Sequence, residues 1–125
     1  MTTIELISFG HKYGDENGDL KFDLRFIPNP FYVENLRPLT GMDKICADYV
    51  FSSPVAKKTF SLLSEIVITT ASGFEGKDRE KIKVAIGCTG GQHRSVAFTE
   101  ALAAKAEAAG FPVSVRHREV EARKF

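Results

Sequence analysis

A glycine-rich stretch, Gly87 to Ser95, holds the residues whose types and spacing are best suited to chemistry. It reads Gly-Cys-Thr-Gly-Gly-Gln-His-Arg-Ser and lies between a short apolar run and an alanine-rich segment. Such a loop brings unpaired backbone N–H groups to the start of a helix, where the helix dipole adds about half a positive charge. Arg94 can donate two hydrogen bonds to an oxyanion, and Thr89 and Ser95 offer hydroxyls. The stretch predicts an anion-binding loop with the candidate ligand residues Cys88, Thr89, Gly90, Gly91, Gln92, His93, Arg94 and Ser95.

The same stretch admits a plainer interpretation. Gly90 and Gly91 can serve only to allow a tight turn between a strand and a helix, with His93 and Arg94 left in solvent. A plain turn needs one or two special residues, whereas this stretch combines a glycine pair, hydroxyls, a histidine and an arginine. We therefore favour the anion-binding interpretation.

A catalytic interpretation is also open, because Cys88, Arg94 and Ser95 fit the Cys-x5-Arg-Ser pattern of cysteine-dependent phosphatases. A thiolate at a helix N-terminus can attack phosphorus while an arginine holds the phosphoryl oxygens. The leaving oxygen then needs a carboxylic acid, for which Asp23 and Asp43 are the candidates. Those phosphatases usually carry histidine before the cysteine, where this chain has glycine, so the catalytic interpretation ranks second.

Apolar patterning places the loop at the end of a buried strand. Residues 84 to 88 predict a short strand covered on both faces, and residues 93 to 109, which are rich in alanine and end at Gly110, predict a helix. A last strand is expected from Pro112 to Glu119. Strand, loop, helix and strand in that order, within about 35 residues, form a βαβ unit. The fold class expected is α/β, a single small domain with a mostly parallel sheet flanked by helices.

Further strands and helices are expected before this unit. Their patterns predict strands over residues 4 to 10 and 20 to 26, and helices over residues 43 to 51 and 54 to 72. Residues 27 to 41 contain three prolines and predict an irregular loop, of a length that is usually functional in a small domain. If the second strand neighbours the strand at 84 to 88, this loop overhangs the glycine-rich stretch and can close a pocket there. On their own, its polar residues fit a solvated face as well.

The composition bounds the class of protein. With 125 residues, 17 Lys and Arg against 16 Asp and Glu, and 43% hydrophobic residues, the chain has the balance of one soluble domain, residues 1 to 125. No apolar run reaches the ~18 residues of a membrane span and the N-terminus lacks a signal-peptide pattern, so we expect a cytoplasmic protein without a membrane partner. Two cysteines and three dispersed histidines show no metal-binding or redox spacing. Neither a metal site nor a cofactor is expected.

The C-terminal third carries the excess of positive charge. Residues 88 to 125 hold six basic and four acidic residues, a net charge of +2. Four of the basic residues lie within the last ten positions, and two glutamates interrupt them. On charge alone, this segment fits a solvated tail as well as a contact with the phosphate backbone of RNA.

Several stretches together resemble one family, the C-terminal domain of RapZ, the bacterial RNase adapter protein. They occur in the family's order and span nearly the whole chain. The matching stretches are Ser8-Phe9-Gly10, Lys12-Tyr13-Gly14, Asp23-Leu24-Arg25-Phe26-Ile27-Pro28-Asn29-Pro30, Leu36-Arg37-Pro38-Leu39-Thr40-Gly41-Met42-Asp43-Lys44, Ala85 to Val96 and Arg116-His117-Arg118.

The resemblance implies an α/β domain with a regulatory adapter role. It implies binding of a phosphosugar, which is glucosamine 6-phosphate in the enterobacterial member, and of structured small RNA. The phosphosugar maps onto the loop from Cys88 to Ser95, with Asp23 and Asn29 as sugar contacts in the facing loop. The RNA maps onto the basic C-terminus, here Arg116, Arg118, Arg123 and Lys124. Full-length members assemble through this domain, so a homo-oligomer is also implied.

Two departures limit what the resemblance implies. Full-length members carry a P-loop kinase-like domain before this one, and this sequence has no counterpart to it, so nucleotide hydrolysis is not implied. We expect either a natural stand-alone domain or a domain excised from a longer protein. Phe31 follows Asn29-Pro30 at a position where the resemblance leads us to expect histidine. An imidazole contact to the sugar is therefore missing, and the identity of the phosphorylated ligand stays open.

Overall fold

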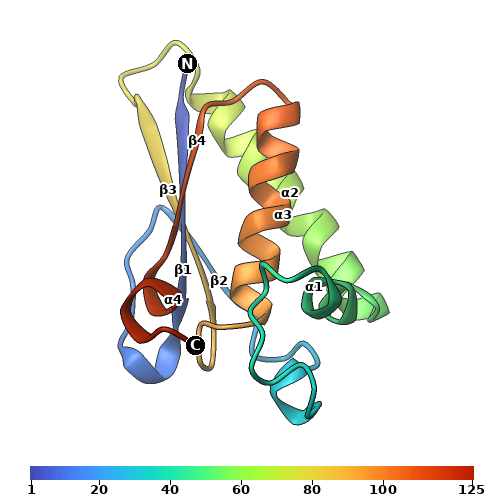
Figure 1. The fold of residues 1–125 in the computed structure, drawn as a ribbon. Helices are drawn as coiled ribbons and strands as arrows, with labels where there is room; N and C mark the ends of the chain where they lie inside the picture. The colour runs from blue at the N-terminus through green and yellow to red at the C-terminus, as the bar shows by residue number, and fades with distance from the viewer.

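Four β-strands form one sheet in which every neighbouring pair is parallel. In the computed structural model, which describes all 125 residues, the strands are β1 Thr3–Gly10, β2 Leu20–Asp23, β3 Lys81–Cys88 and β4 Val113–His117. Their order is β2-β3-β1-β4, so the second strand does neighbour β3. The carboxyl ends of all four strands therefore lie at one end of the sheet, the lower end in Figure 1. This is the end at which ligands bind in open α/β sheets.

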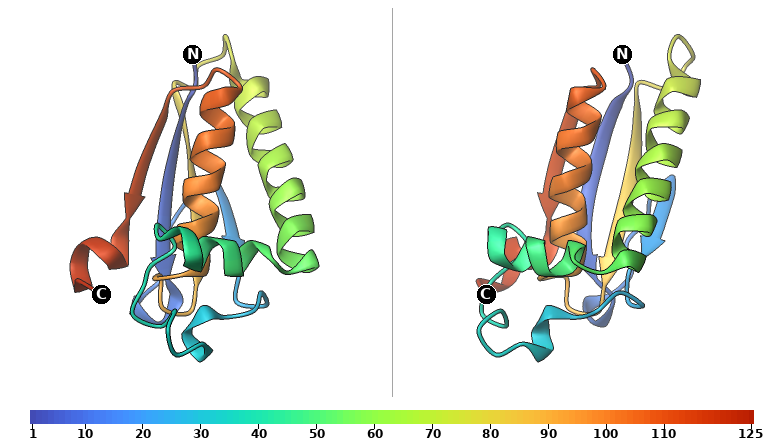
Figure 2. Two further views of the ribbon diagram at one scale, coloured as in Figure 1. Left: turned by 45° about the vertical axis from the view of Figure 1, so that its right-hand side comes forward. Right: turned by 90° about the vertical axis from the view of Figure 1, so that its right-hand side faces the viewer.

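The longer helices cover one face of the sheet. The helices are α1 Lys44–Phe51, α2 Pro54–Phe74, α3 Arg94–Ala108 and α4 Arg118–Arg123, with short 3-10 turns η1 His11–Tyr13 and η2 Pro30–Tyr32. Figure 2 shows α2 and α3 side by side on the same face, with α1 across their lower ends. No helix has the length and apolar character needed to cross a lipid bilayer. The α/β class expected from the sequence is confirmed.

The core lies between the sheet and these helices. Ile4 and Leu6 of β1 and Val84 and Ile86 of β3 are buried in a cluster of 19 residues that includes apolar side chains of α1, α2 and α3. Phe98 of α3 takes part, its ring centroid 5.0 Å from that of Phe51. Each such side chain stabilises the fold by roughly 1.5 to 3 kcal/mol through the apolar surface that it buries. The core thus fixes the end of β3 and the start of α3, which flank the glycine-rich stretch.

Two predicted strands are too long. The strand expected over residues 20 to 26 ends at Asp23, because the Asp23 carboxylate accepts the backbone N–H of Arg25 at 3.0 Å and turns the chain away from the sheet. The strand expected as far as Glu119 ends at His117, and α4 begins at Arg118. The residues after His117 consequently form a short helix packed beside the end of β1, where the end of the last strand was expected.

Candidate functional site

The glycine-rich stretch forms the connection from β3 to α3. β3 ends at Cys88, α3 begins at Arg94, and the residue preceding the helix, His93, makes no side-chain capping bond. The backbone N–H groups of residues 89 to 93 donate to no acceptor within the chain. Unpaired N–H groups at a helix N-terminus attract negative charge. Four of these five residues, Thr89, Gly90, Gln92 and His93, line the pocket described next, so the loop offers backbone donors of the kind that bind an anion.

A pocket opens above this loop. Its volume is about 410 Å³, and its wall is made by residues from the loop, from η1 and η2, and from the C-terminal end of the chain. Seven of the predicted ligand residues lie in this wall: Asn29, Cys88, Thr89, Gly90, Gln92, His93 and Arg94. The proline-rich loop thus overhangs the glycine-rich one, which agrees with the expectation from strand order.

The remaining three predicted ligand residues lie outside the pocket wall. Ser95 is fully buried and its backbone N–H points to the Cys88 sulfur at 3.5 Å. Gly91 has a φ of +70° and packs against the opposite side, where an added Cβ would lie 2.6 Å from Glu119 Cγ. Asp23 forms an ion pair with Arg25, with the closest atoms 2.6 Å apart. These three residues shape the loop or its surroundings in this conformation.

Arg94 ties the glycine-rich loop to the turn that follows β2. Its Nη1 donates to the backbone oxygens of Arg25 at 3.0 Å and Ile27 at 2.8 Å, and its Nη2 donates to Thr89 Oγ1 at 3.3 Å. The side chain is only 3% exposed, and its Nε–H is buried without a hydrogen-bond partner. A buried donor left without a partner costs stability, so this residue of the pocket wall retains capacity for an acceptor.

The side chains of Gln92 and His93 connect the glycine-rich loop to the proline-rich loop. Gln92 Nε2 donates to the backbone oxygens of Arg37 and Leu39 at 2.8 and 2.7 Å, and His93 Nε2 lies 3.2 Å from the Arg37 oxygen. Burial lowers the pKa of His93 below its usual value, since the charged imidazolium is poorly solvated there. His93 is thereby kept neutral at pH 7. These side chains position the proline-rich loop.

The catalytic interpretation finds its nucleophile and its arginine in the pocket but not its acid. Cys88 is 2% exposed, and its thiol donates to Ser95 Oγ at 3.2 Å. Neither aspartate nor glutamate contributes to the pocket wall. The hydrogen bonds from Arg25 lower the pKa of Asp23 to about 2, which makes this carboxyl group a poor proton donor near neutral pH. The pocket therefore holds no Asp or Glu side chain placed to protonate a leaving oxygen.

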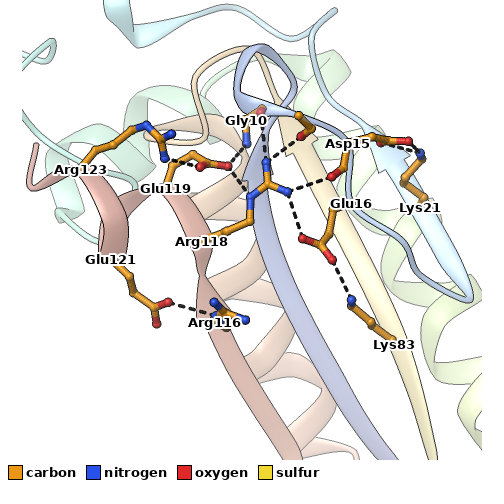
Figure 3. Close-up of polar contacts among 11 residues, drawn as sticks. Gly10, Asp15, Glu16, Lys21, Lys83, Arg116, Arg118, Glu119, Glu121 and Arg123 are labelled. Carbon is orange, nitrogen blue, oxygen red and sulfur yellow. Dashed lines mark hydrogen bonds and ion pairs between the residues drawn. The ribbon is translucent and has the colours of Figure 1, made fainter.

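Arg118, one of the four predicted RNA contacts, is used within the chain. Figure 3 shows its guanidinium between α4 and the loop that follows β1. It donates to the carboxylates of Glu119 and Glu16 and to the backbone oxygens of Gly14 and Asp15, at 2.7 to 3.0 Å. It also lies 5.4 Å from the centroid of the Phe9 ring. Arg118 is therefore an internal clamp in this conformation.

The other three basic residues are more accessible. The Arg116 side chain is 66% exposed and makes one surface ion pair, with Glu121 at 3.2 Å. Arg123 pairs with Glu119 at 2.6 Å and stacks on the Tyr13 ring. Lys124 is exposed and makes no ion pair. Arg116 and Lys124 are the basic side chains of this segment with most freedom to meet an external phosphate.

Sequence reasoning missed four residues of the pocket wall, Lys12, Phe31, Tyr32 and Phe125. Lys12 belongs to one of the stretches that match the family, and Phe31 is the residue that departs from it. Nothing in the spacing of either residue indicated a pocket. Lys12 adds a cation, and the other three add aromatic rings. No group of three or more His, Cys, Asp or Glu side chains is arranged to hold a metal ion.

Comparison with curated proteins finds many similar bacterial sequences. The chain is 44% identical over 119 residues to a nucleotide-binding protein of Lactobacillus gasseri and 42% identical over 122 residues to one of Lactiplantibacillus plantarum. It is 44% identical over 122 residues to a nucleotide-binding protein of Bifidobacterium adolescentis. These alignments cover 94%, 97% and 97% of the chain but only 40%, 41% and 39% of the relatives. The chain therefore spans about two fifths of their length.

The family comparison covers nearly the whole chain. Residues 2–121 match the RapZ C-terminal domain. This range includes the glycine-rich loop, the proline-rich loop and most of α4. The resemblance seen in the sequence is thereby confirmed, and the chain belongs to the RapZ C-terminal domain family.

Proposed function

We propose that this domain is a regulatory binding module for a phosphorylated metabolite, a phosphosugar such as glucosamine 6-phosphate. The observation that carries the proposal is the run of five unpaired backbone N–H groups at residues 89 to 93, at the start of α3. Together with the partnerless Nε–H of Arg94, these donors match the oxygens of a phosphate group.

The charge of the pocket supports the same ligand class. Lys12 and Arg94 are its cationic side chains, and no Asp or Glu side chain lies in the wall. The helix dipole of α3 adds partial positive charge at the same place. The aromatic and amide side chains of the upper wall leave room for the organic part of the ligand. A phosphate monoester fits this distribution better than inorganic phosphate alone.

Isothermal titration calorimetry with glucosamine 6-phosphate tests the proposal, with unphosphorylated glucosamine as the control ligand. We expect binding of the phosphate ester only. Arg94→Ala should weaken it about tenfold or more, because a charge-assisted hydrogen bond contributes roughly 1.5 to 3 kcal/mol. Arg116→Ala, outside the pocket, should leave it unchanged, and thermal melts should show that both variants are folded. Equal affinity for glucosamine 6-phosphate and for unphosphorylated glucosamine would refute the proposal.

A phosphatase assay separates the two interpretations of Cys88. The missing acid in the pocket wall leads us to expect no hydrolysis of p-nitrophenyl phosphate above background. Hydrolysis by the wild type that disappears in Cys88→Ser would establish the catalytic interpretation instead.

RNA contact through the C-terminal segment is the second part of the proposal. Its support is the exposure of Arg116, near the carboxyl end of β4, and of Lys124, which follows α4. Exposed cations can neutralise RNA phosphates, whereas Arg118 is occupied by its internal partners. The contact would thus depend on residues 116 and 124, with a smaller part from Arg123.

A further inference from the structure

The C-terminal helix α4 is attached to the rest of the domain through charged side chains. Glu119 is its only buried side chain, and no residue of α4 belongs to either apolar cluster of the core. A helix of six residues is not stable by itself in water. The docked position of α4 therefore depends on the contacts of Glu119 and of the two arginines beside it, Arg118 and Arg123.

Glu119 occupies the position of an anion between these arginines. Its Oε2 accepts Arg118 Nε at 2.8 Å and its Oε1 accepts Arg123 Nη1 at 2.6 Å, so one carboxylate engages both guanidinium groups (Figure 3). Guanidinium groups bind carboxylate and phosphate oxygens with similar geometry. A phosphate group of RNA can therefore replace the Glu119 carboxylate, and in the docked state the carboxylate excludes it.

The same carboxylate closes the end of the central strand. Ser8 is the last residue of β1 that pairs with β4, and the Gly10 N–H, two residues further along, donates to Glu119 Oε2 at 2.8 Å. When α4 undocks, this N–H loses its acceptor. The Gly10 amide therefore reports directly whether α4 is docked.

The other partners of the arginines also permit undocking. Arg118 pairs with Glu16 at 3.0 Å, and the Glu16 carboxylate pairs at the same time with Lys83 of β3 at 2.8 Å. Glu16 thus keeps a cationic partner when Arg118 leaves. Arg123 has a side chain that is 33% exposed, and partly exposed ion pairs are weakened by dissolved ions.

From these contacts we infer that α4 is an autoinhibitory latch, in which Glu119 competes with RNA phosphates for Arg118 and Arg123. The inference rests on the RNA contact of the proposed function and adds its regulation. In the docked state Arg116 and Lys124 are the accessible cations of the segment, whereas undocking adds two guanidinium groups. The RNA affinity is then lowered in proportion to the fraction of molecules in which α4 is undocked.

RNA titrations of the wild type and of Glu119→Gln test the latch. Glutamine keeps an oxygen that can accept the Gly10 N–H but removes the charge that holds Arg118 and Arg123. Glu119→Gln should therefore bind a short RNA hairpin about tenfold more tightly, and the slope of log affinity against log salt concentration should become steeper by about 1 to 2 units. Glu107→Gln, at an exposed position of α3, changes the net charge equally and should keep the wild-type affinity.

Hydrogen exchange of the Gly10 amide supplies a readout that does not need a variant. Addition of RNA to the wild type should speed exchange of this amide, because RNA favours the undocked state of α4. The Leu24 amide, which donates to the Gly87 oxygen at 2.8 Å, is the internal control and should keep its exchange rate.

The outcomes separate the latch from the RNA contact on which it rests. If the wild type binds RNA while Gly10 stays protected, or while a folded Glu119→Gln gains no affinity, the latch is wrong and the RNA contact stands. If the hairpin binds neither the wild type nor Glu119→Gln, the latch fails together with the RNA part of the proposed function. Should Glu119→Gln not fold, the exchange of Gly10 in the wild type still decides between a docked and an undocked α4.

Discussion

The Glu119 carboxylate accepts the backbone N–H of Gly10 at 2.8 Å, which joins the C-terminal helix to the end of the central strand. Glu119 is 1% exposed, and its two oxygens also accept Arg118 Nε at 2.8 Å and Arg123 Nη1 at 2.6 Å. A Cβ added to Gly91 would lie only 2.6 Å from Glu119 Cγ. Through Glu119, the α4 helix thus packs against Gly91 of the glycine-rich loop and against the end of β1.

Glu119→Ala should destabilise the fold by about 3 kcal/mol, because it leaves the Gly10 N–H and two guanidinium groups without their acceptor. Urea unfolding followed by circular dichroism measures this loss. The control, Glu121→Ala, breaks an exposed ion pair with Arg116 and should cost less than about 1 kcal/mol. A similar loss of unfolding free energy in both variants would contradict a stabilising role for the contacts of Glu119.

The two neighbouring glycines of the loop should respond differently to alanine. Gly91→Ala should cost about 2 kcal/mol or more, since Gly91 has a φ of +70° and its new Cβ would lie 2.6 Å from Gly10 N. Gly90→Ala should change stability by less than about 0.5 kcal/mol, because the nearest atom, Lys12 Cε, is 4.0 Å away. Thermal melts of the two variants measure this difference. Equal shifts of the melting temperature in Gly90→Ala and Gly91→Ala would contradict the loop geometry.

The lowered pKa of His93 makes stability depend on pH. In the unfolded chain the imidazole takes up a proton near pH 6.5, the ordinary pKa of histidine, while burial keeps folded His93 neutral to a lower pH. Stability from this residue is therefore present above pH 6.5 and is lost as the pH falls below it. The unfolding free energy should thus fall less between neutral and mildly acidic buffer in His93→Gln than in the wild type. An NMR titration that puts the His93 pKa at or above 6.5 would contradict this.

RNA binding, if the basic segment makes it, should depend strongly on salt. Replacing Arg116 and Lys124 with glutamine should reduce the slope of log affinity against log salt concentration by about 1 to 2 units for a short RNA hairpin. Lys77→Gln is the matched control, because Lys77 lies in the loop between the end of α2 and the start of β3, at the amino end of the strand. Undetectable binding, or a slope that the double substitution leaves unchanged, removes the RNA part of the proposal.

The α/β fold could be predicted from local sequence patterns, because apolar runs, alanine content and the positions of glycine and proline identify the strand and the helices near the loop. The apolar run at 84 to 88 lies within β3, and the alanine-rich segment that ends at Gly110 matches α3 to within one residue or so. Pro54 marked the start of α2, where Ser53 caps the helix as its side chain accepts the Ala56 N–H. Such signals are local in sequence, so no tertiary information was needed to interpret them.

The C-terminal segment could not be interpreted in that way. The sequence placed Arg118 and Glu119 at the end of a strand, in a segment that fitted a solvated tail as well as an RNA contact. Their partners Glu16 and Gly10 lie more than a hundred residues earlier. The pocket wall has the same character, because Phe31 and Phe125 come together only through the tertiary fold. Charge alternation and aromatic content do not encode such distant contacts.

The binding of an anion by the backbone of residues 89 to 93 is the central claim, and amide NMR tests it most directly. A ¹⁵N-labelled chain titrated with glucosamine 6-phosphate should show its largest amide shifts at Thr89, Gly90, Gly91, Gln92 and His93. Smaller shifts should follow at Lys12 and Phe31, which line the same pocket. Saturating shifts at those five amides are the result the account predicts. Unmoved amides there, with shifts elsewhere or none at all, would contradict it.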